Sequence, residues 1–80
     1  MTYQELMTAL DTKVPVEWRG RADHERARGC VTAIIYRGKD KNGDALISAE
    51  VATHSSPQSV IICRPEDVSF WRPIEERGIN

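Results

Sequence analysis

The sequence lacks long apolar runs. Its longest wholly apolar stretches, such as residues 60–63, have at most four residues, whereas a helix that crosses a membrane needs about 20. The first residues also lack the basic start and the apolar run of a secretory signal. These absences predict no membrane association and a cytoplasmic location.

Glycine, proline and cysteine are scarce, at five, four and two residues of 80. Together with 40% hydrophobic and 29% charged residues, this composition excludes collagen-like, disordered and disulfide-dense chains. The formal net charge is −1, so no strong overall field attracts nucleic acid or an acidic membrane. A chain this short encloses one core, and we predict a single domain over residues 1–80.

The first ten residues carry the clearest local pattern. Four apolar side chains follow the spacing of one helical stripe: Tyr3, Leu6, Met7 and Leu10. Thr2 and Glu5 have the spacing of a capping box. The pattern predicts a helix over residues 2–10. Because an isolated helix this short is marginal in water, it must dock on the rest of the protein or on a partner.

The rest of the chain has the composition and alternation of short β-strands. The expected strands and the expected 3₁₀ turn are residues 14–18, 30–36, 45–53, 60–63 and 69–72, with the turn at 65–68. The pattern of residues 20–29 indicates either a long exposed hairpin loop or a single solvated helical turn, and residues 73–80 are expected to form a frayed tail.

One antiparallel register of the second and third strands gives a uniformly apolar face. It places three pairs opposite each other: Val31 with Val51, Ala33 with Ala49, and Ile35 with Ile47. Ile34 and Leu46 then lie on the other face and need cover, for which the N-terminal helix is the candidate.

This order of elements resembles a known fold. Five short strands, a long first loop, tight later turns and a 3₁₀ turn before the last strand resemble an SH3-like barrel over residues 14–72, with a helix added at the N-terminus. The resemblance implies a mainly β, five-stranded barrel. The segment 28–31 (Arg-Gly-Cys-Val) also resembles the Gly-x-Val entry of KOW-type nucleic-acid and ribosome-associated barrels. The whole chain looks like short bacterial proteins of phages and conjugative elements.

The cysteines and histidines offer the residue types of a Cys2His2 zinc site. Cys30, Cys63, His24 and His54 lack the close pairs that such sites use. A disulfide is also disfavoured, because the register separates the cysteines by two strand spacings, ~9–10 Å, beyond the ~7 Å Cα limit. We expect no metal or cofactor, and cysteines that act as small apolar fillers.

Catalytic patterns are also weak. His54 stands beside two serines in a turn with no third orienting group, and His24 lies with two acidic neighbours in an exposed loop that cannot exclude water. The common nucleotide and metalloprotease motifs do not occur. The sequence therefore predicts a protein that is not an enzyme, unless a homodimer built a pocket between its subunits.

Charge is unevenly distributed along the chain. Residues 19–41 hold seven basic and three acidic side chains, and we expect the two loops that carry them to approach each other at one end of the barrel. The candidate contact residues are Arg21, Arg26, Arg28, Arg37 and Lys39, with aromatic surface from Trp18 and Tyr36. The alternative interpretation is that the arginines are only solvated and that Trp18, Trp71 and Phe70 fill the core.

These observations predict a small non-enzymatic binding or adaptor module, either a monomer or a homodimer. A protein or peptide partner is favoured, because the acidic remainder of the chain weakens attraction to a nucleic-acid duplex. The alternative is a nucleic-acid-binding accessory protein that uses the basic loops of residues 19–41.

Overall fold

The computed structural model describes residues 1–22 and 24–71. Over these residues the elements are α1 (Tyr3–Thr12), β1 (Val16–Arg19), β2 (Arg26–Lys39), β3 (Ala45–Thr53), β4 (Val60–Cys63), the 3₁₀ helix η1 (Pro65–Asp67) and β5 (Val68–Phe70). The predictions of a mainly β chain, of the N-terminal helix and of a 3₁₀ turn before the last strand are confirmed. Arg72, which was expected to end the last strand, and the predicted tail lie outside the described residues.

Helix α1 begins at the capping box that the sequence predicted. The Glu5 backbone N–H donates to the Thr2 hydroxyl at 3.1 Å, and the Thr2 N–H donates to the Glu5 carboxylate at 2.8 Å. The helix continues to Thr12 and ends where Lys13 adopts a left-handed conformation with φ 62°, its N–H donating to the Ala9 carbonyl. The helix is thus longer than predicted, because its end is set by that cap.

Only part of the predicted helical stripe docks on the sheet. Leu6 and Ala9 are fully buried, and Leu10 is half-buried against the core. Tyr3 and Met7 belong to the same stripe but remain exposed. The helix therefore carries more apolar side chains on this stripe than the sheet covers.

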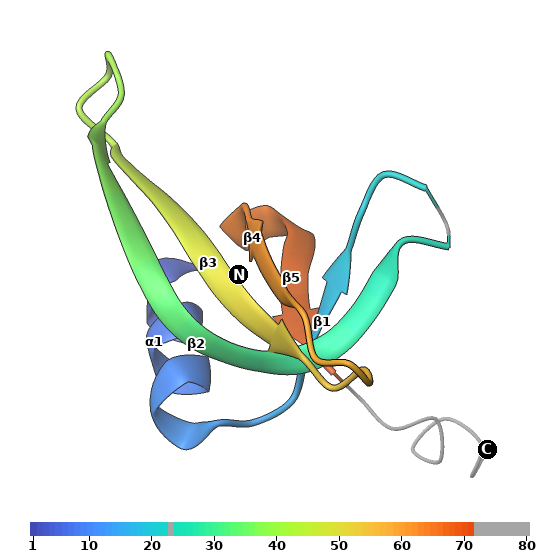
Figure 1. Ribbon diagram of the computed structural model, residues 1–80. Coiled ribbons are helices and arrows are strands. Elements are labelled where there is room, and N and C mark those ends of the chain that lie inside the picture. The colour runs from blue at the N-terminus through green and yellow to red at the C-terminus, as the bar shows by residue number, and fades with distance from the viewer. Residues whose placement is uncertain (23, 72–80) are drawn as a thin grey trace, which may run out of the picture.

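The five strands form one antiparallel sheet in the order β4-β3-β2-β1-β5. The edges β4 and β5 do not pair with each other within the described ranges, so the sheet is not closed into a barrel. Strand β2 is 14 residues long and curves through the sheet (Figure 1). Its two register shifts account for the curvature, because an extra residue in one strand bends that strand.

The predicted register holds at Val31, which pairs with Val51. The pairs beyond it are shifted by one residue: Ala33 with Glu50, Ile34 with Ala49, Ile35 with Ser48, and Tyr36 with Ile47. The predicted partners of Ala33 and Ile35 are therefore wrong. A shift of one residue exchanges the two faces of a strand, so the β2 side chains from Ala33 to Tyr36 face the other way from the prediction.

Thr32 is the extra residue at this bulge. Its hydroxyl donates to the Glu50 carbonyl at 3.2 Å and lies 2.8 Å from the Glu50 carboxylate, which holds the irregular position. The bulge brings Ile34 and Tyr36 to the same face as Val31. The prediction that the helix covers the face opposite Val31 is wrong, because α1 packs on the Val31 face. Ile34 packs against the core only because the bulge turns it to that face, and Leu46 stays exposed.

The two faces of the sheet differ. The covered face, under α1, holds the buried core of Leu6, Ala9, Val16, Val31, Ala49, Val51 and Val68. The open face carries Arg28, Cys30 and Thr32 of β2, with Glu50 of β3. Small aliphatic side chains fill the core, so the interpretation of the tryptophans as core is wrong: Trp18 and Trp71 are half-buried, and Phe70 is exposed. Over the described residues, no helix is long and apolar enough to cross a membrane.

Candidate functional site

The seven predicted contact residues do not form one surface. The β1–β2 and β2–β3 connections leave opposite ends of β2, so the expectation that these loops approach each other is wrong (Figure 1). The predicted residues instead fall into separate groups: Trp18 and Arg21 in a cleft beside η1, Arg28 on the open face, Tyr36 in a groove beside α1, Arg37 and Lys39 toward the β2–β3 turn, and Arg26 exposed at the start of β2.

The cleft lies between the β1–β2 connection and the segment from β4 to η1, with a volume of about 450 Å³. Its charged lining is balanced, with Arg21 and Arg64 against Glu25 and Asp67. The Glu25 carboxylate already accepts the Ala22 N–H at 3.0 Å. The cleft is therefore not a strongly electropositive site.

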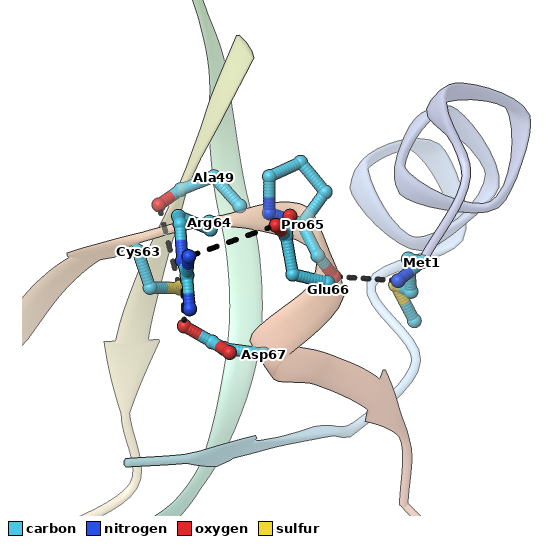
Figure 2. Close-up of polar contacts among 7 residues, drawn as sticks. All are labelled: Met1, Ala49, Cys63, Arg64, Pro65, Glu66 and Asp67. Carbon is cyan, nitrogen blue, oxygen red and sulfur yellow. Dashed lines mark hydrogen bonds and ion pairs between the residues drawn. The ribbon is translucent and has the colours of Figure 1, made fainter. Parts of the chain in front are cut away.

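Ion pairs hold the η1 wall of the cleft together (Figure 2). The Arg64 guanidinium lies 3.4 Å from the Asp67 carboxylate and 3.9 Å from the Glu66 carboxylate. The Met1 amine donates to the carbonyls of Pro65 and Val68, which ties the start of α1 to η1 and β5. This wall has a defined shape, but its charged groups already have partners.

Cys63 lies in the same wall, at the end of β4. Its thiol donates to the Ala49 carbonyl at 3.7 Å (Figure 2). Burial, and in second place the charge of Asp67, raise the pKa of the Cys63 thiol from 9.0 to about 11. Cys63 therefore stays a protonated thiol at neutral pH and is a poor nucleophile.

The groove between α1 and the β2–β3 hairpin is different in character, and its volume is about 620 Å³. Its lining is Tyr3, Met7, Leu10, Ile34, Tyr36, Ala45 and Ile47. No charged side chain of the described residues lines it, and its rim is open to solvent, since Tyr36 is 62% and Tyr3 50% exposed. Exposed apolar surface of this kind marks interaction sites.

Sequence reasoning found one residue of this groove, Tyr36, and missed Tyr3 and Met7 as site residues. The helical stripe was the signal that could have found them, because it contained more apolar side chains than a short helix can bury. Tyr36 lines the groove only because the bulge at Thr32 turns it toward α1.

The open face brings together two of the four zinc-type residues. The Cys30 sulfur lies 3.5 Å from His54 Nε2 and 3.4 Å from the Lys13 carbonyl oxygen. Cys63 lies on the covered face and His24 in the β1–β2 connection. Within residues 1–22 and 24–71 there is no group of three metal-ligating side chains. Beside this pair, the Arg28 guanidinium stacks 4.4 Å from the centroid of the Trp71 ring.

No family model matches the chain, and no curated protein or solved structure shows significant similarity to it.

Proposed function

We propose that the chain is a non-enzymatic binding module whose groove between α1 and the β2–β3 hairpin takes an apolar segment of a partner protein. The observation that carries the proposal is the unfilled apolar lining, in which Tyr3, Met7 and Tyr36 remain exposed although they adjoin the core. Tyrosine and methionine are enriched in protein interfaces.

The shape of the groove supports a protein segment over a small molecule. Small-molecule sites are concave and use a few convergent polar groups to orient the ligand. This groove is open along its rim, and the polar side-chain groups that residues 1–22 and 24–71 bring to its lining are the hydroxyls of Tyr3 and Tyr36. A row of apolar side chains from a partner fits such a lining, because burying them needs no directional polar contact.

The placement of the basic residues weakens the nucleic-acid alternative. Nonspecific binding needs several phosphate contacts made together. Arg21 lies in the charge-balanced cleft, Arg28 stacks on Trp71, and Lys39 lies at the other end of β2. Among the residues that the structure describes, these three basic side chains therefore lie apart and do not support that interpretation.

We also propose that the fold is related to SH3-like barrels. The support is the order of elements, with five strands in succession and η1 immediately before β5. The long first loop predicted over residues 20–29 is wrong, because β2 begins at Arg26. The open sheet and the added helix α1 are departures from a closed barrel.

The binding proposal is tested by recovering partners from a native extract with the full chain and with the variants Met7→Ser and Tyr36→Ser. The recovered protein is then titrated into each purified variant. We expect affinity to fall roughly tenfold or more in either variant, because buried aromatic and apolar anchors carry most interface energy. We also expect recovery to be insensitive to nuclease.

Leu46→Ser is the matched control, because Leu46 is an exposed apolar residue that does not line the groove. It should bind the partner as the wild type does. Equal loss in all three variants would contradict the groove. Recovery of nucleic acid that is lost in Arg26→Ala/Arg28→Ala would support the alternative instead, and a dimer that dissociates in Tyr36→Ser would show that a second copy fills the groove.

A further inference from the structure

The open face contains a cysteine and a histidine in contact. Cys30 lies within β2, and His54 follows the last residue of β3. The His54 backbone N–H donates to the Arg28 carbonyl at 2.9 Å, which continues the ladder between the two strands. That bond holds the histidine beside the thiol, with 3.5 Å between Sγ and Nε2.

Both side chains are reachable from solvent. Cys30 is half-buried and His54 is exposed. The thiol hydrogen has two acceptors within reach, the Lys13 carbonyl oxygen at 3.4 Å and His54 Nε2, when the histidine carries its own proton on Nδ1. An imidazole beside an accessible thiol is the arrangement that turns a cysteine into a nucleophile.

Charges of both signs lie around this pair, and one of the acidic groups is Glu50 on the same open face. Arg28 lies two residues before Cys30 on the same face of β2, with its guanidinium over Trp71. Its cross-strand partner on β1 is Glu17, which itself lies 3.3 Å from the Arg19 guanidinium. These charges offset one another, so the features that favour reactivity at Cys30 are its partial exposure and its contact with His54.

We propose that Cys30 is a thiol-modification site that exchanges with small-molecule disulfides and uses His54 as its proton acceptor. The Cys30 thiol gives its proton to His54 Nε2, and the sulfur attacks one sulfur of the disulfide. A new S–S bond forms as the old one breaks, and the departing thiolate takes the proton from His54. One thiol and one disulfide become one mixed disulfide and one thiol, so the step needs no further oxidant.

Cys63 provides an internal comparison in the same chain. It lies on the covered face, donates to the Ala49 carbonyl, and has Asp67 rather than an imidazole as its charged neighbour. We therefore expect exchange at Cys30 and none at Cys63 in the folded protein at neutral pH.

The test uses oxidised glutathione as the probe, the full chain, and intact-mass measurement of adduct formation over time. Cys63→Ala keeps Cys30 and should gain one glutathionyl group, whereas Cys30→Ala should gain none while folded. Adding His54→Ala to Cys63→Ala should slow the reaction near pH 7 roughly tenfold or more, because a positioned base contributes about 10²–10⁴-fold.

His24→Ala in the Cys63→Ala background is the matched control, since it removes an exposed histidine from the β1–β2 connection, and its rate should not change. Near pH 10, where model thiols ionise unaided, the His54→Ala and parent proteins should react at similar rates. That convergence separates the loss of a proton acceptor from the loss of the fold. The proposal is overturned if Cys63 is modified faster than Cys30, if folded Cys63→Ala stays unmodified while the urea-unfolded form reacts, or if His54→Ala leaves the rate at pH 7 unchanged.

Discussion

The covered and open faces of the sheet share strand β2 but use it in different ways. On the covered face, Val31 and Ile34 pack under α1, and their contacts are apolar. On the open face, Thr32 and Arg28 make polar and cation–π contacts at the surface. Burial of apolar side chains therefore stabilises the fold on the covered face, while the open face positions accessible polar groups.

The largest expected effect is on the covered face. Leu6→Ala removes a fully buried side chain from between α1 and the sheet, and such changes cost about 2–5 kcal/mol. Thr32→Ala, on the open face, removes an exposed hydroxyl and should cost about 1 kcal/mol or less. Urea unfolding followed by circular dichroism measures both. Equal losses of unfolding free energy in the two variants would contradict this difference between the faces.

A smaller effect is expected where the open face has its own packing. Arg28→Ala removes the guanidinium from the Trp71 ring, and an exposed cation–π contact contributes about 0.5–1 kcal/mol. Tryptophan fluorescence should change with it, because the ring loses its cover. Arg26→Ala, an exposed neighbour two residues earlier, serves as the control and should change neither quantity. An unchanged unfolding free energy in Arg28→Ala would show that the contact with Trp71 does not stabilise the fold.

A further effect concerns pH and Cys63, and it develops only above about pH 9. Its pKa is raised from 9.0 to about 11 in the folded chain, so the unfolded chain loses this proton first as pH rises. The free energy of unfolding therefore falls as the pH rises from about 9 to 11, and ionisation of Cys63 does not change it below that range. The difference in unfolding free energy between the wild type and Cys63→Ala should shrink from below pH 9 to near pH 11. A constant difference would show that Cys63 is not desolvated on the covered face.

Much of the fold follows from local sequence signals. Nearly every element could be predicted, because its signal depends only on neighbouring residues. These signals are the capping box at Thr2 and Glu5, the turn between β2 and β3, and the apolar runs of the strands. The register of β2 against β3 could not be predicted from local signals. The bulge at Thr32 depends on the Glu50 side chain across the sheet and on the burial of Ile34 under α1.

The candidate site was predicted only in fragments. Tyr36 was identified as an aromatic anchor, but its partners Tyr3 and Met7 come from a helix whose position is set by tertiary packing. The basic residues of the segment 19–41 were expected to lie together because they are close along the chain, but they are not close in space. The long strand between the two loops separates them.

The bulge at Thr32 also determines where the length of β2 can change. Deleting Thr32 would remove the extra residue and leave Ile34 paired with Ala49 and Tyr36 with Ile47, so both would still face α1. Deleting a residue between Ile34 and Tyr36 would instead turn Tyr36 to the opposite face. Strand β2 therefore tolerates a deletion at residue 32. In the segment that follows, a deletion of one residue would remove Tyr36 from the lining of the groove.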